Sequence, residues 1–387
     1  MKRIIDKFFV AMFLISLLLP TAHITHQQIA HRENRYLAKY IPLYDAKTQT
    51  INLQYGNDFE NYIKDRFWGR MRLIYLEKHI NYILAQRFVR YGETTLDKEK
   101  KFMYEHLTAG EPKPAGQRAI IKGLTDFNEF CIQNYIKLYP VVMPRKESIY
   151  IPDLVIQDKN DKLRETFNYV SQKSGVKIIS ILDGLLAKKE KSPYLLYHKT
   201  DHHATIDGAF IGYNVLIKEI QKNFPEVKAV SSDELNYSEN KKVNTEGGLG
   251  YRNGVTCTSA GIPDFICEEF LDTEFRYAKH KDRENLNIEE TRTDYVIKRD
   301  YYYPYGAELK VMVFGDSFTP NLLEFLPYSF KKVRYIRING PRGIERSERM
   351  KLLKYYEDEI MDFQPDILIL WFFYSEFANF RDIAKKE

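Results

Sequence analysis

The feature that most constrains the fold is a series of short apolar runs that alternate with helical stretches from about residue 120 onward. The expected strands are Tyr139–Pro144, Val176–Leu182, Leu309–Phe314, Val333–Ile338 and Asp366–Phe372. The expected helices between them cover 126–138, 163–174, 207–223, 317–324 and 346–363. Apolar runs separated by helices are typical of a parallel sheet covered on both faces. The sequence therefore predicts an α/β fold with a central parallel sheet.

One of these runs ends in a turn that carries a serine. Val311–Phe314 leads directly into Gly315, Asp316 and Ser317. Parallel sheets bind ligands at the C-terminal ends of their strands, and a turn from strand to helix is a common place for a nucleophile. The alternative is a purely structural turn, because all three residues favour turns.

A second segment contains the groups that such a serine needs. A serine hydroxyl requires a base to take its proton and a carboxylate to orient that base. Asp201 and His203 are two residues apart, which predicts a triad of Ser317, His203 and Asp201. His202 adjoins Asp201 and competes for the role of base. Asp201 as a capping or loop carboxylate is the structural alternative.

Composition excludes several classes of function. The chain has 387 residues and 44% hydrophobic content, enough for one large or two smaller domains. The net charge of +5 is spread along the chain, so nucleic-acid binding is not indicated. Three cysteines (Cys131, Cys257, Cys267) are too few for a disulfide scaffold, and whether Cys257 and Cys267 pair stays open. No Cys/His spacing indicates a metal site.

The N-terminus has the pattern of an export signal. Lys2, Arg3 and Lys7 precede an apolar run over Phe8–Leu19. A positive start and an apolar centre indicate a signal peptide or a signal anchor. No clear cleavage site follows, which favours an uncleaved anchor with the rest of the chain outside the cytoplasm. Cleavage would make the protein secreted, and a buried core helix is the remaining alternative.

The predicted organisation has three parts. Residues 1–25 form the signal anchor or signal peptide, and residues 26–118 form a juxtamembrane and N-terminal helical segment. Apolar residues recur at helical spacing between Phe59 and Gln86, while 96–117 is expected to be a loop with a short helix. Residues 119–387 form the main domain, with an insertion at about 231–306 that should contain short strands or helices.

Several motifs resemble those of a known family. Gly315–Phe318 resembles the first block of the SGNH (GDSL) hydrolases. Thr200–His203 resembles the Thr-Asp-x-His-Trp segment of the alginate O-acetyltransferase-like and DHHW proteins, which also place the Asp-x-His pair before the serine. Ala204 departs from the family's tryptophan. Further matches are Tyr197, Gly208, Glu33–Arg35, Phe59–Arg70 and Pro144–Tyr150.

The resemblance implies an SGNH-hydrolase-like three-layer sandwich with a central parallel sheet, following an N-terminal membrane anchor. It implies an O-acetyltransferase that modifies a polysaccharide through an acetyl-serine, without a cofactor. A multi-span membrane O-acyltransferase would supply the acetyl group. A polysaccharide acetylesterase and a non-catalytic glycan-binding or scaffold protein remain alternatives.

Other residues are predicted to complete the site. The Ser317 N–H and either Asn339 or Gly340 would stabilise the oxyanion. Trp371 and Tyr374 are predicted to contact a sugar, with core packing as the alternative for Trp371. Lys146 is predicted to contact an anionic polymer, with a solvated loop as the alternative. Asp316 is expected to stabilise its turn by hydrogen bonds rather than act as an acid.

One short motif also allows the hypothesis of a metal-dependent enzyme. Asp201-His202-His203 matches the name of the DHH phosphoesterases. Those enzymes need further Asp and His segments to hold two metal ions. The expected N-terminal order of such segments is missing, which favours the serine mechanism.

Overall fold

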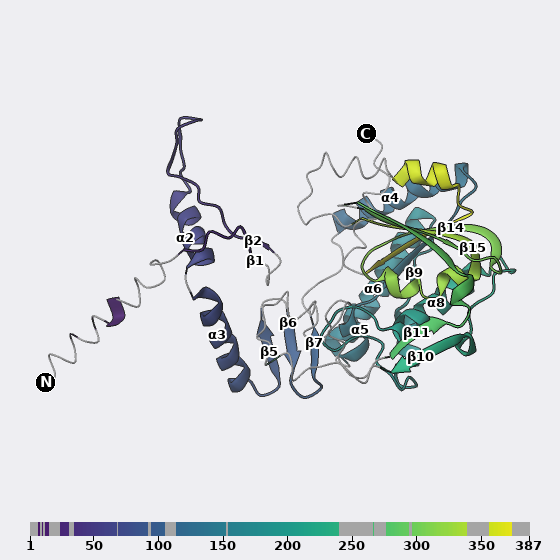
Figure 1. The fold of residues 1–387 in the computed structure, drawn as a ribbon, viewed down its shortest axis with the longest axis horizontal. Helices are drawn as coiled ribbons and strands as arrows, with labels where there is room; N and C mark the ends of the chain where they lie inside the picture. Colours follow the sequence, from purple (N-terminus) through teal and green to yellow (C-terminus); the bar gives the residue numbers. More distant parts are fainter. Residues whose placement is uncertain are drawn as a thin grey trace. The chain divides into compact units, whose positions relative to one another are not determined.

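The computed structural model describes most of the chain (Figure 1). The chain divides into two compact units, each treated separately below. The first includes the described residues up to Tyr104 together with Ile266, and the second includes the other described residues from Pro114 onward. The described ranges are 24–30, 35–67, 69–91, 94–104, 114–151, 154–239, 276–293, 296–338 and 356–373, with single positions at 7, 10, 12–14 and 266.

The first unit contains two helices where the sequence predicted one continuous pattern. Helix α2 (Tyr55–Arg66) and helix α3 (Arg70–Leu84) are separated by a short break. Gly69 lies in this break with φ of 79°, a left-handed conformation that glycine adopts without steric cost. The chain can therefore change direction between the two helices.

The rest of the first unit is made of short strands. Strands β5 (Phe88–Tyr91), β6 (Thr94–Asp97) and β7 (Phe102–Tyr104) form an antiparallel sheet, so the prediction of a loop with a short helix over 96–117 is wrong for residues 96–104. Leu96 and Met103 are fully buried in a small core, which the surrounding charged residues obscured in the sequence. The described part of this unit also contains two short antiparallel pairs: β1 (Ile29–Ala30) with β2 (Arg35–Tyr36), and β3 (Tyr44–Asp45) with β4 (Thr50–Ile51).

Arg66 organises the chain before α2. Its guanidinium is buried and donates hydrogen bonds to the carbonyls of Thr25, Gln27 and Ala38. The neighbouring Asp65 accepts from the Ala38 N–H at 2.8 Å. The Asp65-Arg66 pair therefore folds the preceding segment back onto the end of α2.

The second unit is built on a seven-stranded mixed sheet. Its strands from β15 to β9 run parallel, whereas β12 and β13 join one edge in antiparallel pairing. The predicted central parallel sheet is therefore present but is only mostly parallel. In order across the sheet the strands are β12 (Asn287–Arg292), β13 (Val296–Tyr302), β15 (Phe330–Ile338), β14 (Ala307–Gly315), β16 (Ile367–Phe373), β8 (Lys137–Met143) and β9 (Ile179–Ser180).

The antiparallel edge comes from the stretch predicted to be an insertion. Strands β12 and β13 lie within 231–306 and extend the central sheet. Their side chains are mostly exposed or half-buried, which explains why they lack the apolar signature of the inner strands. The same stretch contains a separate antiparallel pair of strands, β10 (Leu235–Glu239) and β11 (Arg276–His280). Arg276 of β11 pairs with Asp207 at 2.7 Å.

Helices of the second unit share one hydrophobic core with the sheet. Buried side chains of α4, α6 and α8 belong to the same cluster as the inner strands. The predicted strand over Val176–Leu182 is reduced to β9, because Leu182 begins a helix that contains Asp183. Asp183 thus lies outside the sheet edge and pairs with Arg164. Among the described residues the helices of this unit are α4 (Pro114–Gln133), α5 (Lys146–Tyr150), α6 (Leu154–Ser174), α7 (Leu182–Lys189), α8 (Ile206–Ile220), α11 (Thr319–Leu322) and residues 356–363.

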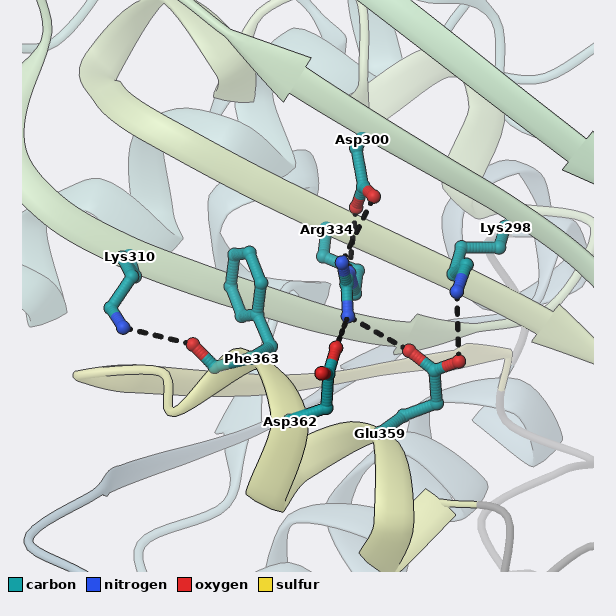
Figure 2. A network of polar contacts seen from close by, with 7 residues as sticks. All are labelled: Lys298, Asp300, Lys310, Arg334, Glu359, Asp362 and Phe363. Carbon is teal, nitrogen blue, oxygen red and sulfur yellow. Dashed lines mark hydrogen bonds and ion pairs between the residues drawn. The ribbon is translucent and has the colours of Figure 1, made fainter.

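A charged network attaches the helix of residues 356–363 to the sheet (Figure 2). Arg334 of β15 donates two hydrogen bonds to Asp300 of β13, at 2.7 and 3.0 Å, and reaches Glu359 and Asp362 of the helix. Burial opposes its charge, but these carboxylates raise the pKa of Arg334 above its ordinary value. The guanidinium therefore ties three elements together.

Two predictions concern residues that lie wholly or mostly outside the described ranges. The predicted anchor, Phe8–Leu19, lies mostly outside the described residues, and none of the described helices is long and apolar enough to cross a bilayer. Cys257 and Cys267 are also outside them. Cys131 is a buried free thiol, and burial raises its pKa to about 12.

Candidate active site

The loop that carries Asp201 and His203 is closed at its base. Tyr197 and Ala204 form an antiparallel bridge, and the Thr205 N–H donates to the Leu196 carbonyl at 3.0 Å. The Thr205 hydroxyl then accepts from Gly208 and caps α8. A Cβ at Gly208 would lie 2.2 Å from the Leu196 carbonyl oxygen, so the start of α8 packs directly on the loop.

Asp201 and His203 form a hydrogen-bonded pair. One oxygen, Oδ1 of Asp201, lies 2.6 Å from His203 Nδ1 and accepts from the His203 backbone N–H at 2.8 Å. Asp201 is 1% exposed. A proton on Nδ1 leaves the lone pair of the neutral ring on Nε2, which has no hydrogen-bond partner among the described residues. The pair has the arrangement of a base and its orienting carboxylate.

The electrostatics favour the reactive protonation states. Burial alone would raise the pKa of Asp201, but its hydrogen bond with His203 and the positive charge that His203 carries at low pH outweigh burial and leave the pKa well below its ordinary value. Burial lowers the pKa of His203 below 6.5, and the opposing attraction of Asp201 is smaller. Near neutral pH the aspartate is therefore ionised and the imidazole is neutral.

The serine loop begins where β14 ends, at Gly315. The space around Gly315 does not admit a side chain. A Cβ at Gly315 would lie 1.9 Å from Thr319 Oγ1 and 3.0 Å from the Trp371 carbonyl oxygen. Ser317 follows two residues later, half-buried, just before α11. The loop is therefore pressed against the neighbouring strand β16 at the C-terminal edge of the sheet.

Asp316 holds this loop to β16. Its Oδ1 accepts from the Phe318 N–H at 2.8 Å, and its Oδ2 accepts from the Phe373 N–H at 2.6 Å. Both carboxylate oxygens are thus engaged with main-chain donors. This is the turn-stabilising role expected for Asp316.

Aromatic packing and one side-chain bond join the serine loop to the histidine loop. The Phe318 ring lies 4.7 Å from the His203 ring and stacks on Phe373 at 4.4 Å. Asn321 Nδ2 donates to the Ala204 carbonyl at 2.9 Å. The residue that follows Ser317 therefore touches the predicted base. Ser317 itself makes no hydrogen bond to His203 Nε2 in the described structure, and such bonds often form only with substrate bound.

His202 has a different position from His203. Its Nδ1 lies 3.9 Å from Asp201 Oδ1, beyond hydrogen-bond distance, and its ring packs at a tilt of 32° against His203, with the ring centres 4.1 Å apart. Asp201, His202 and His203 are close enough to be considered as metal ligands. However, the direct 2.6 Å contact between Asp201 and His203 leaves no space for an ion between them. The geometry thus favours His203 as the partner of Asp201.

Two residues predicted to contact substrate are enclosed by protein. Trp371 is fully buried in the core, where a Cβ at Gly212 would come within 2.9 Å of its ring. Lys146 is 2% exposed and directs its ammonium group to backbone carbonyls of the Asp201 loop. Trp371 therefore packs in the core, which was the alternative to contact with a sugar. Lys146 is neither in a solvated loop nor accessible to a polymer. Asn339, Gly340 and Tyr374 lie outside the described residues.

The sequence did not indicate Asn321 or Phe373 as parts of this region, nor the stacking of Phe318 on Phe373. Phe373 ends a strand that reads only as an apolar run, and Asn321 follows a proline in a short helix. Nothing local marks their partners. The family-like segment Pro144–Tyr150 lies elsewhere in the chain and contacts the Asp201 loop through Lys146.

A hollow elsewhere in the second unit is separate from these residues. It has a volume of about 480 Å³ and includes Lys310, Lys332 and Arg334 in its lining. These residues precede the C-terminal ends of β14 and β15, because Lys310 is paired with Lys332 and Phe314 with Ile336. The hollow therefore lies away from the strand ends that lead to Ser317.

The fold resembles that of solved proteins at low sequence identity. Bacillus cereus PatB1 with a sulfonyl adduct aligns with a TM-score of 0.55 and 15% identity, over 76% of this chain and 97% of that one. A DHHW family protein from Eubacterium siraeum aligns with a TM-score of 0.54 and 14% identity, over 76% and 96%. A second PatB1 structure gives 0.52 and 15%, over 78% and 100%.

Comparison by sequence adds no relative: no family model matches the chain, and no curated protein does. The structural matches cover three quarters of the chain and nearly all of each matched protein. They agree with the resemblance found in the motifs around Asp201 and Ser317. The chain has the fold shared by PatB1 and the Eubacterium siraeum DHHW family protein.

Proposed function

We propose that the protein is a serine-dependent O-acetyltransferase that acts on a polysaccharide outside the cytoplasm. Ser317 is the nucleophile, His203 the base and Asp201 the carboxylate that orients it. The observation that carries the proposal is the buried Asp201–His203 hydrogen bond, packed through Phe318 against the loop of Ser317. The fold shared with PatB1 and the DHHW family protein supports it.

The first half of the reaction forms an acetyl-serine. His203 Nε2 takes the proton from Ser317 Oγ as this oxygen attacks the acetyl carbonyl carbon of the donor. The Ser317 N–H and a group at Asn339 or Gly340 donate hydrogen bonds to the resulting oxyanion. Asp201 stabilises the imidazolium. The bond to the donor oxygen then breaks, and His203 returns the proton to that leaving oxygen.

The second half transfers the acetyl group to a sugar. A hydroxyl of the polysaccharide loses its proton to His203 and attacks the acetyl-serine carbonyl. The ester bond to Ser317 Oγ breaks, and the serine recovers its proton from His203. The chemistry needs no cofactor. With water in place of the sugar, the same residues hydrolyse the ester, so transfer requires an acceptor that excludes water from the site.

The cellular setting is part of the proposal. The positive and apolar N-terminal pattern favours an anchor that places the site outside the cytoplasm. Acetyl groups activated in the cytoplasm would then have to cross the membrane. A multi-span O-acyltransferase is the class of partner that could deliver them to Ser317.

A sulfonyl fluoride provides the direct test, since one PatB1 structure carries a sulfonyl adduct. Phenylmethylsulfonyl fluoride should form a sulfonate ester on Ser317 Oγ with release of fluoride. We expect the modified peptide to contain Ser317 and the turnover of an aryl acetate to stop. Ser317→Ala should be neither labelled nor active, whereas Ser232→Ala, at an exposed serine, should behave like the unaltered protein.

Acceptor specificity requires a second measurement. With an aryl acetate as donor and an oligosaccharide in solution, an acetylated sugar product supports transfer, and free acetate alone supports an esterase. An inactive, unlabelled protein that binds the oligosaccharide would contradict the proposal and favour a glycan-binding role.

A further inference from the structure

We propose that Lys146 is a positioning residue that shapes the Asp201 loop by gathering its carbonyls around one ammonium group. The inference rests on the proposed function of Asp201 and His203. It assigns the lysine a role inside the protein rather than in contact with a polymer.

The geometry around the ammonium group is complete. Lys146 Nζ donates to the carbonyl oxygens of His198, Lys199 and Asp201 at 2.9, 3.0 and 3.0 Å. An ammonium group has three N–H donors, and each has an acceptor here. The side chain is almost entirely enclosed, so water cannot replace it easily.

This arrangement is demanding for both partners. A buried cation is tolerated only when hydrogen bonds replace its hydration. Three carbonyls that converge on one point would in turn repel each other without a cation between them. We therefore expect the loop to adopt this shape only when the ammonium group is present.

Neighbours of Lys146 support the same loop from the same side. The Tyr197 hydroxyl donates to the Pro144 carbonyl at 2.6 Å, and the Leu196 N–H donates to the Tyr150 hydroxyl at 2.7 Å. Pro144 and Tyr150 flank Lys146 at the end of β8 and in α5. This segment thus acts as a template for residues 196–201.

The loop's shape determines where the base points. The carbonyl of Asp201 is held by Lys146, while its carboxylate accepts both hydrogen bonds from His203. A shift of the Asp201 backbone would move the imidazole with it. Displacements of about 1 Å in a catalytic group reduce rates by about a hundredfold.

The chemistry of the side chain explains why lysine is required. Methionine has a similar length but no donors. Arginine has a planar fork that suits flat acceptors, whereas the three carbonyls here surround a point charge. Lys146→Met and Lys146→Arg should therefore both disturb the loop, although each retains the apolar stem.

The test compares Lys146→Met with Lys310→Met in the whole protein. Lys310 donates one hydrogen bond to the Phe363 carbonyl at 2.9 Å and lies away from the strand ends. We expect Lys146→Met to lower kcat on an aryl acetate by about a hundredfold with little change in KM. Lys310→Met should leave both constants unchanged. Unchanged kcat in a folded Lys146→Met protein would overturn the inference.

Chemical rescue provides a second readout that depends on the ammonium group itself. Lys146→Ala removes the atoms of propylammonium, so added propylammonium should restore kcat. Propanol and tetramethylammonium should not, because the first lacks the charge and the second lacks donors. Equal rescue by all three compounds, or by none in a folded protein, would contradict the inference.

A magnetic resonance readout separates this inference from the proposed function. The Nδ1 proton of His203 should give a low-field signal that disappears or moves in Lys146→Met and stays in Lys310→Met. If Ser317→Ala retains activity but the signal responds to Lys146, the proposed function fails and the positioning role stands. If the signal is the same in Lys146→Met as in the unaltered protein, the positioning role fails, whatever activity is measured.

Discussion

Asp316 joins the serine loop to the neighbouring strand, because its Oδ2 accepts a hydrogen bond from the Phe373 N–H at 2.6 Å. The other oxygen accepts from Phe318 in its own turn. The residue next to the proposed nucleophile therefore connects β14 to β16. Its charge is used to fix geometry and not to transfer a proton.

Replacing Asp316 should separate stability from chemistry. We expect Asp316→Ala to lower the free energy of unfolding by about 2–4 kcal/mol, because two main-chain N–H groups lose charged acceptors. Urea denaturation measures this loss. Activity on an aryl acetate should fall without reaching zero, since Ser317 and His203 remain. A complete loss in a folded protein would instead indicate a direct role in the reaction.

Asp201→Asn should reduce activity far more than it reduces stability. An amide can keep much of the packing but favours the wrong tautomer of His203, so kcat should fall by about ten thousandfold. Steady-state kinetics on an aryl acetate measures the change. Asp207→Asn is the matched control, because Asp207 pairs with Arg276 and should affect stability alone. Similar kcat values for the two variants would exclude the triad.

The activity should rise with pH through a midpoint below 6.5. Burial lowers the pKa of His203, so the neutral base persists to lower pH than in a free histidine. Its folded-state pKa is depressed, so the stability it contributes is present above the unfolded value and is lost as pH falls through the folded value. The pH dependence of kcat/KM measures the midpoint.

The control for this pH profile is His280. Burial also lowers the pKa of His280, but this ring stacks on Tyr328 at 3.8 Å and makes no described contact with His203. His280→Gln should leave the midpoint of kcat/KM in place. A midpoint that moves in His280→Gln, or one above 6.5 in the unaltered protein, would argue against His203 as the base.

Gly315→Ala should damage the serine loop. The added Cβ would lie 1.9 Å from Thr319 Oγ1, so the loop or α11 must shift. We expect a loss of stability of about 1–3 kcal/mol and a lower yield of sulfonyl labelling at Ser317. Gly56→Ala is the control, because its Cβ would meet nothing within 4 Å in α2 and should be neutral or stabilising.

Arg334→Met should destabilise the second unit without altering chemistry at Ser317. It leaves Asp300, Glu359 and Asp362 close together without their shared cation, which we expect to cost about 3 kcal/mol. Thermal unfolding measures the loss, and kcat on an aryl acetate should be unchanged at a temperature where the variant is folded. A stability equal to that of the unaltered protein would show that the network in Figure 2 contributes little.

The sequence alone identified the inner strands and their turns. The runs that became β14 and β16 are apolar at every buried position, and a run of this kind reports burial on both faces of a sheet. The Asp201-x-His203 spacing was also sufficient to predict that these two residues pair, because both hydrogen bonds between them are local. Such features depend on neighbours in the chain, so a linear pattern carries them.

Only the tertiary structure decided which distant groups meet. The half-exposed strand β13 joins β15 through main-chain hydrogen bonds, and the types of its side chains do not predict this pairing. Lys146 was predicted to contact a polymer or to lie in a solvated loop, yet it is buried because carbonyls more than fifty positions away converge on it. The Asn321 bond to Ala204 spans an even larger separation. Contacts of this kind depend on how elements pack, and residue type at one position does not encode its partner.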